Sequence, residues 1–250
     1  RGGLVTGPAG VGKTLLFNIV KLFISARNPD AQVIAAAPTH VAAALMNGRT
    51  CEHVLRKHEK TQGERVWFVL DEFSMMTLGT LAEFARRCHV GCNFVVFGDA
   101  KGQFQPIHDQ WTGDVDLSKI EDSGLMGSMA RGLHVHLSIY RRGIGRQLFD
   151  DYTALYAKTD EHPATVLPAL RRKYPAGGRE ALYANCPENL HVCVISHRKR
   201  MALNRKLNRL HSTKIHPGTP TLHLKPRAEH LQNLANQPQP MTIWAGMRLQ

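Results

Sequence analysis

The residues best suited to chemistry are gathered near the start of the chain, in the stretch GPAGVGKT. Gly7, Gly12, Lys13 and Thr14 have the spacing G-x-x-x-x-G-K-[ST], which lets the backbone curl and point its N–H groups at phosphate oxygens. The lysine would neutralise the β and γ phosphates of a nucleotide, and the threonine hydroxyl would ligate Mg²⁺. The motif predicts a phosphate loop made of Gly7, Pro8, Ala9, Gly10, Val11, Gly12, Lys13 and Thr14.

A second candidate group is the acidic pair Asp71 and Glu72, which follows the apolar run VWFVL. In an α/β sheet the carboxyl ends of the strands face the ligand. Asp71 could hold Mg²⁺ through water, and Glu72 could orient and deprotonate an attacking water, so the pair favours hydrolysis over transfer to another hydroxyl. The alternative is an acidic helix cap, because strand-to-helix turns favour Asp. Together the two motifs predict ATP and Mg²⁺ as cofactors, with Thr14 and Asp71 as metal ligands.

The elements that must position these residues alternate along the chain. Short runs rich in β-branched residues predict strands, and longer runs with an apolar period near 3.6 predict helices. A strand before the phosphate loop and a helix after it form the context that a nucleotide site requires. The pattern is typical of a parallel sheet with helices on both faces. The predicted strands cover residues 3–6, 32–37, 66–71, 93–98, 133–137 and 191–196, and the predicted helices cover 13–26, 80–87 and 146–157.

Composition narrows the class of protein further. The net charge is +12, and residues 121–250 hold 19 Lys and Arg against 9 Asp and Glu. Such an excess favours a polyanionic partner such as nucleic acid. No run approaches the roughly 20 apolar residues that span a bilayer, so no membrane partner is expected. Five cysteines without a paired framework favour a reducing, intracellular compartment.

The basic second half includes a predicted helix over residues 196–214, with apolar residues on one side and Arg and Lys on the other. These cations could follow a DNA backbone, or they could form a solvated basic face. Residues 161–187 mix Pro, Gly and basic residues without a clear period. That stretch predicts an irregular insertion or a pair of surface helices.

Four stretches behind the phosphate loop carry a resemblance to a known family. APTHVAA, LDEFSMM, FGDAKGQFQPI and LSIYRR, in that order, resemble the motifs of superfamily 1B helicases of the RecD/Pif-like branch. The match covers residues 3–142 well, and a weaker one continues through 193–208 and 244–250. It implies a P-loop NTPase of the RecA-like α/β type. An ATPase domain over residues 1–142 would be followed by a partial second α/β lobe over 143–250, a basic motor domain truncated at its C-terminus.

The resemblance also implies a contact with single-stranded DNA. Pro38, Thr39 and His40 lie at a predicted strand-to-helix turn, where hydroxyl and N–H groups can hold a phosphodiester. His40 stands where the family commonly has glycine, so its imidazole could stack on a base or simply fill space. The alternative is a capping threonine beside a surface histidine.

Two more residues would act on the γ phosphate. The family places a glutamine sensor three residues after the Asp of its Gly-Asp pair, but here Gly102 takes that place and Gln103 comes one later. Either the loop carries a one-residue insertion and Gln103 serves, or the sensor is degraded. Arg141 matches the arginine that would stabilise charge in the transition state. Arg142 is a neighbouring competitor, and a basic domain linker is the simpler alternative.

The resemblance implies a DNA helicase that hydrolyses ATP to move along single-stranded DNA from 5′ to 3′. Roles in DNA repair, recombination and telomere maintenance belong to the same expectation, and so does a location in the nucleus or mitochondrion if the source is eukaryotic. A viral-type RNA helicase of superfamily 1 and a degenerate relic that binds nucleic acid without turnover stay open. The family's last motifs do not occur in residues 143–250. We therefore expect weak ATP hydrolysis and little unwinding from these 250 residues alone.

Overall fold

The chain divides into two compact units, Arg1–Glu161 and His162–Gln250, and each is considered by itself. Gln103 and the strand predicted over residues 191–196 lie outside the described part of the chain. Among the helices that are described, none is long and apolar enough to cross a membrane. The computed structural model describes residues 2–102, 117–143, 146–156, 163–173, 197–213, 219–225 and 240–245.

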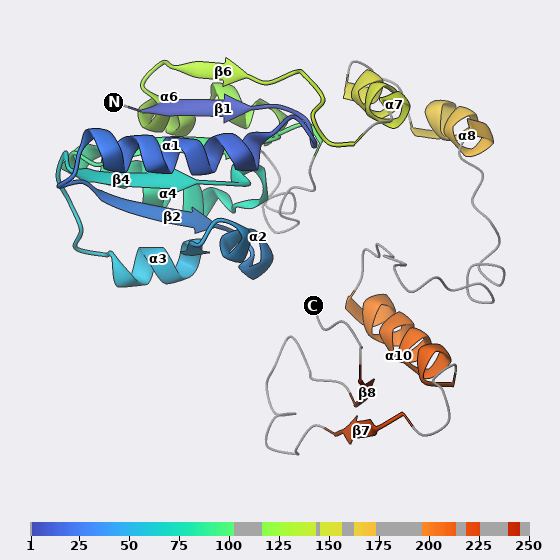
Figure 1. The fold of residues 1–250 in the computed structure, drawn as a ribbon. Coiled ribbons are helices and arrows are strands. Elements are labelled where there is room, and N and C mark those ends of the chain that lie inside the picture. Colours follow the sequence, from blue (N-terminus) through green and yellow to red (C-terminus); the bar gives the residue numbers. More distant parts are fainter. Residues whose placement is uncertain are drawn as a thin grey trace. The chain divides into compact units, whose positions relative to one another are not determined.

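The first unit is built on a six-stranded sheet in the order β3-β2-β4-β5-β1-β6 (Figure 1). Every neighbouring pair of strands is parallel. Because β5 lies between β4 and β1, the carboxyl ends of these three strands stand side by side at one edge of the sheet. The strands are β1 (Gly3–Thr6), β2 (Gln32–Ala37), β3 (Arg49–Thr50), β4 (Val66–Leu70), β5 (Asn93–Gly98) and β6 (His134–His136).

Helices cover both faces of this sheet, which confirms the predicted fold class (Figure 1). One hydrophobic cluster joins the sheet to α1 and α2, and a second cluster joins it to α3, α4 and α6. The helices are α1 (Lys13–Arg27), α2 (His40–Leu45), α3 (Cys51–Lys57), α4 (Leu78–Arg86), α6 (Gly124–Ala130) and α7 (Gln147–Tyr156), and the 3-10 turns are η1 (Phe73–Met75), η2 (Arg87–Val90) and η3 (Leu117–Asp122).

Successive side chains of the central strands enter different clusters. In β4, Phe68 and Leu70 pack in the cluster of α4 and α6, whereas Val69 packs in the cluster of α1. Side chains of a strand alternate between the two faces of a sheet, so a strand covered on both faces has a continuous apolar sequence. The predictions for β1, β2 and β5 are confirmed to the residue.

Some boundaries differ from the prediction for local reasons. β4 ends at Leu70, one residue before the predicted end, although the N–H of Asp71 still donates to the carbonyl of Ala36 in β2 at 2.9 Å. α4 begins two residues before the predicted start, because the hydroxyl of Thr77 accepts a hydrogen bond from the N–H of Thr80 at 3.1 Å and caps the helix. β6 is shorter than predicted at both ends.

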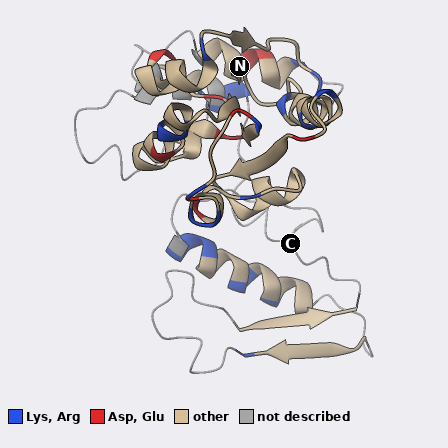
Figure 2. Cartoon of the chain, turned by 90° about the vertical axis from the view of Figure 1, so that its left-hand side faces the viewer, with Lys and Arg blue, Asp and Glu red and all other residues tan. Residues whose placement is uncertain are grey.

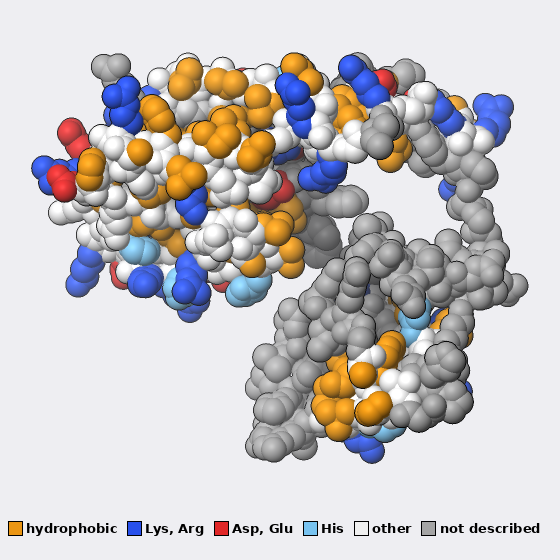
Figure 3. Space-filling model, in the orientation of Figure 1, with side chains coloured by type: hydrophobic (Ala, Val, Ile, Leu, Met, Phe, Trp, Pro, Cys, Tyr) orange, Lys and Arg blue, Asp and Glu red, His pale blue; other side chains and the backbone are white. Residues whose placement is uncertain are grey.

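α1 is apolar on its outer side as well as on the side that faces the sheet. Phe17 and Ile24 are buried against the sheet. The outer apolar side chains recur at i, i+4, i+7 and i+8, and each is more than half exposed. Figure 3 shows hydrophobic side chains on the face of the first unit where α1 lies. The outer stripe consists of Leu15, Ile19, Leu22 and Phe23.

The second unit, as far as it is described, holds two helices and one antiparallel pair of strands. α10 packs on β8 through Asn208, whose side chain accepts from the N–H of Thr242 at 2.9 Å and donates to its carbonyl at 2.8 Å. The helix predicted over 196–214 is confirmed, and part of 161–187 is helical. The elements are α8 (Pro163–Lys173), α10 (His197–Thr213), β7 (Thr221–Leu224) and β8 (Met241–Trp244).

Candidate nucleotide-binding site

The phosphate loop connects β1 to α1, as its sequence predicts. Gly10 and Gly12 have φ values of 88° and 95°, which side-chain-bearing residues rarely adopt. Gly12 is also the N-cap of α1, and no side chain caps this helix end. The N–H groups in the first turn of α1 are therefore not used by a capping side chain, and a helix N-terminus of this kind favours an anion.

Lys13, the first residue of α1, is almost fully buried beneath the loop. Its Nζ donates to the carbonyl of Gly7 at 2.6 Å and to that of Pro8 at 3.0 Å. Burial lowers the pKa of Lys13, while the charges of Asp99, Glu72 and Asp71 act in the opposite direction. The amine is thus held between the loop and a group of carboxylates. The neighbouring Thr14 side chain is exposed at the helix start.

Asp71 and Glu72 supply two of these carboxylates, at the carboxyl end of β4. Asp71 is 4% exposed, and its Oδ1 accepts a hydrogen bond from the N–H of Glu72 at 2.9 Å. Burial and then the charge of Glu72 raise the pKa of Asp71 to about 6. Glu72 has a left-handed backbone with φ of 55°, an uncommon conformation for a residue with a side chain. Such conformations gather at functional sites, and this one sets the direction of the Glu72 side chain.

The third carboxylate belongs to Asp99, which follows β5. It is 5% exposed, and its Oδ1 accepts from the N–H groups of Lys101 at 3.3 Å and Gly102 at 2.9 Å. These bonds hold the start of the segment that leads to Gln103. Among the described residues, no group of three acidic, His or Cys side chains is placed to hold a metal ion by itself. The buried Asp71, with its raised pKa, and the adjacent Glu72 are carboxylates that a Mg²⁺ ion carried by a nucleotide would stabilise.

The segment after β6 contacts the phosphate loop at Gly10. The N–H of Arg141 donates to the carbonyl of Gly10 at 2.8 Å, and the ring of Tyr140 lies against Gly10. The charge of Arg142 is among the causes that lower the pKa of Lys13. The structure thus brings the backbone of Arg141 to the loop, together with the charge of its neighbour Arg142.

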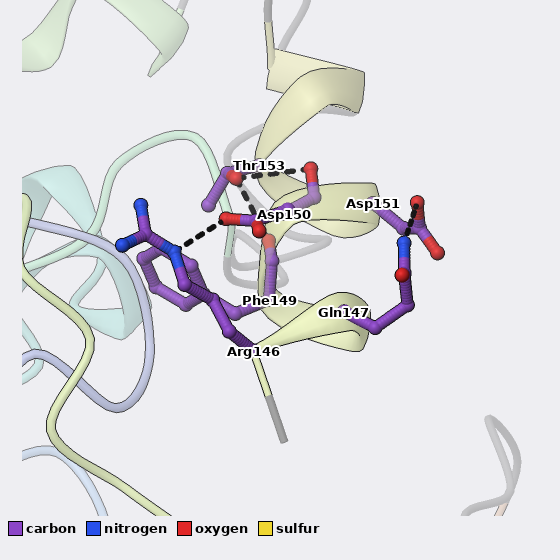
Figure 4. A network of polar contacts seen from close by, with 6 residues as sticks. All are labelled: Arg146, Gln147, Phe149, Asp150, Asp151 and Thr153. Atoms are coloured by element: carbon purple, nitrogen blue, oxygen red, sulfur yellow. Dashed lines mark hydrogen bonds and ion pairs between the residues drawn. The ribbon is translucent and has the colours of Figure 1, made fainter. Parts of the chain in front are cut away.

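Sequence reasoning missed the aromatic residues of α7. Phe149 is 5% exposed, and its ring lies 4.7 Å from that of Tyr140 and 5.4 Å from that of Tyr152. Tyr152 in turn donates from its Oη to the backbone carbonyl of Ala9. Figure 4 shows the polar contacts that stabilise this helix, among them the ion pair of Arg146 with Asp150 at 3.0 Å. The spacing i, i+3 of the two aromatic residues is the only signal that the sequence carries.

The predicted DNA-contact residues follow β2, the strand next to β4, with two strands between β2 and the phosphate loop's β1. Pro38, Thr39 and His40 follow β2, which β4 and β5 separate from β1. Thr39 is the N-cap of α2, and its hydroxyl accepts a hydrogen bond from the N–H of Ala42 at 3.2 Å. His40 is exposed at the start of that helix. The capping role is therefore present, and a contact with DNA stays a prediction.

Comparison with known proteins agrees with this geometry. Residues 2–123 match the family model described as AAA domain. Among solved structures, the Pif1 helicase from Candida albicans aligns with a TM-score of 0.61 and 18% identity, over 97% of this chain and 59% of that chain. The chain has the fold of the Pif1 helicases. It spans about 59% of the length of the Candida protein.

Two further structures with the Pif1 name come from a Bacteroides species. The unliganded protein aligns with a TM-score of 0.49 and 17% identity, over 90% of this chain and 54% of that one. Its complex with ADP-AlF4 aligns with a TM-score of 0.48 and 18% identity, over 90% and 55%. The search of curated proteins gave no match. In the Pif1-like fold, the described site consists of the phosphate loop, the acidic strand ends and the segment after β6.

Proposed function

We propose that this chain is the ATP-hydrolysing core of a superfamily 1B helicase, which moves along single-stranded DNA from 5′ to 3′. One observation carries the proposal. A buried lysine in a phosphate loop faces three carboxylates from the ends of two neighbouring strands, within a Pif1-like fold. We extend the same proposal to roles in DNA repair, recombination and telomere maintenance.

The chain's own residues divide the work of hydrolysis. The loop N–H groups and Lys13 would bind the phosphates, and Thr14 and Asp71 would hold Mg²⁺, which draws negative charge from the phosphate oxygens. Glu72 would orient the attacking water and take its proton. The guanidinium of Arg141, or of Arg142 beside it, would stabilise charge that develops on the γ phosphate. Gln103 would sense that phosphate.

Nucleic acid is the second ligand in this proposal. The excess of Lys and Arg in residues 121–250 favours a polyanion. Pro38, Thr39 and His40 would contact the sugar-phosphate backbone, since such contacts position a strand without reading its sequence. The choice of DNA over RNA, and the direction of movement, follow the resemblance of the motifs.

The test compares ATP hydrolysis in the presence of two oligonucleotides of the same sequence, one of single-stranded DNA and one of RNA. We expect DNA to raise the steady-state rate several-fold more than RNA does. Greater stimulation by RNA would favour an RNA helicase. Hydrolysis that neither strand stimulates would refute the nucleic-acid part of the proposal and leave an ATPase of another kind.

A further inference from the structure

Four consecutive backbone carbonyls of the phosphate loop accept hydrogen bonds. The donors to the last two come from parts of the first unit that are distant in sequence. Lys13 Nζ holds the carbonyls of Gly7 and Pro8. The next two carbonyls are those of Ala9, bonded by the Tyr152 phenol, and Gly10, bonded by the N–H of Arg141. Tyr152 lies 143 positions further along the chain than Ala9.

The direction of a loop carbonyl determines whether the N–H of the next residue points toward a bound phosphate or away from it. A peptide group is planar and trans, so the C=O of Ala9 and the N–H of Gly10 point in opposite directions. The loop can offer the Gly10 N–H to a phosphate only while the Ala9 oxygen points away from that phosphate. A flipped peptide would instead turn a partly negative oxygen toward an anion.

Glycine makes such a flip inexpensive. Gly10 has a φ of 88°, and glycine adopts positive and negative φ about equally readily. Because Gly10 has no side chain, it gives the Ala9–Gly10 peptide no preferred direction, and an external contact must do so. The phenol of Tyr152 supplies that contact on the Ala9 oxygen.

The aromatic cluster holds the phenol in place. Phe149 packs between Tyr140 and Tyr152, and Tyr140 also contacts Gly10. Burial and the charge of Asp99 raise the pKa of Tyr152, so its hydroxyl stays protonated and able to donate at neutral pH.

We propose that Tyr152 is a positioning residue of the nucleotide site. Its phenol fixes the Ala9–Gly10 peptide so that the Gly10 N–H faces the bound phosphates. This assignment rests on the proposed function, because it presupposes that the loop binds a nucleotide. It adds a residue of α7 to the site, which otherwise consists of the phosphate loop, the acidic strand ends and the segment after β6.

The test uses the 250-residue chain with Tyr152→Phe, which removes the hydroxyl and keeps the ring. We expect the Kd of ADP with Mg²⁺ to rise about fivefold, the loss that one hydrogen bond gives. The Kd of pyrophosphate with Mg²⁺ should rise by the same factor, since the contact acts on the phosphate loop and not on the base. Calorimetric titration measures both constants.

Thr153→Val is the matched control. It removes a hydroxyl from the neighbouring residue, whose bonds to the carbonyls of Phe149 and Asp150 stay within α7. We expect it to bind ADP as the wild type does. An unchanged Kd in Tyr152→Phe, an equal loss in Thr153→Val, or a loss confined to ADP would each overturn the positioning role. A wild-type chain that binds neither ADP nor pyrophosphate would instead refute the nucleotide site itself.

Discussion

At the scale of single residues, the site places a buried lysine beside buried carboxylates. Burial disfavours both charged forms, which lowers the pKa of Lys13 and raises that of Asp71 to about 6. Each group is then stabilised by the opposite charge that a nucleotide with Mg²⁺ would bring. The protein without ligand holds these groups at a cost in stability, and that cost can be measured.

The pH dependence of stability gives a first prediction. The pKa of Asp71 in the folded protein, about 6, lies above its ordinary value of 3.8. As the pH rises from about 4 to 6, the unfolded chain loses a proton that the folded chain keeps, so the free energy of unfolding falls. Asp71→Asn cannot ionise, so the variant does not undergo this decrease in the free energy of unfolding. Without ligand at pH 7, we expect the variant to have a free energy of unfolding about 1–3 kcal/mol above wild type.

Urea unfolding at pH 4 and pH 7 measures the effect. The gain should be absent at pH 4, where Asp71 is protonated in the folded protein. Glu83→Gln, at an exposed carboxylate of α4, serves as the control and should show no such gain. Equal stabilities of Asp71→Asn and wild type at pH 7 would contradict the account.

The second prediction concerns the loop backbone at Gly10. A Cβ added there would lie 2.8 Å from a ring carbon of Tyr140, and the φ of 88° is strained for any residue with a side chain. We expect Gly10→Ala to lower the free energy of unfolding by about 1–2 kcal/mol and to weaken ADP binding. Gly124→Ala is the control, because a Cβ there meets no atom within 4 Å. A Gly10→Ala variant as stable as Gly124→Ala would contradict the described packing of Tyr140.

At the scale of elements, α10 carries a line of exposed arginines. Arg198, Arg205 and Arg209 recur at i, i+7 and i+11, which places them along one stripe of the helix, and all three are exposed. Asn208 anchors another side of the helix to β8. No acidic residue occurs in this helix, and Figure 2 shows Lys and Arg recurring along it.

This stripe predicts a salt-dependent contact with single-stranded DNA. Replacing Arg198, Arg205 and Arg209 by alanine should weaken DNA binding and reduce the slope of log affinity against log salt by about 2, since each contact with a single strand contributes about 0.7. The matched variant replaces Arg27, Arg56 and Lys57, three exposed cations of the first unit. Fluorescence anisotropy at several salt concentrations measures both. Equal slopes for the two triple variants would show that the three arginines of α10 do not contact DNA.

The sequence predicts elements well where burial on both faces leaves a continuous apolar run, as in β1, β2 and β5. It does not predict β3, because a pair formed by Arg49 and Thr50 has no pattern of its own. The phosphate loop and the acidic pair are local motifs and were predicted with their elements. The contact of Tyr152 with Ala9 could not be predicted, because it depends on how α7 folds back onto a loop 143 positions earlier.

At the scale of the whole molecule, every described group of the nucleotide site belongs to the first unit. The second unit supplies the basic helix α10. The first unit should therefore retain the fold on which nucleotide binding depends when α10 is altered. Substitutions in α10 should therefore weaken DNA binding and leave nucleotide binding unchanged.

The most direct test of the central claim is steady-state ATP hydrolysis with Mg²⁺ by wild type and Glu72→Gln, alongside the Kd of ADP for each. We predict hydrolysis by wild type that is slow and rises with single-stranded DNA. Glu72→Gln should reduce the rate at least about 100-fold while ADP binding is retained, because it removes the base and not the phosphate loop. Hydrolysis by Glu72→Gln at the wild-type rate, or ADP binding by wild type without any hydrolysis, would contradict the account.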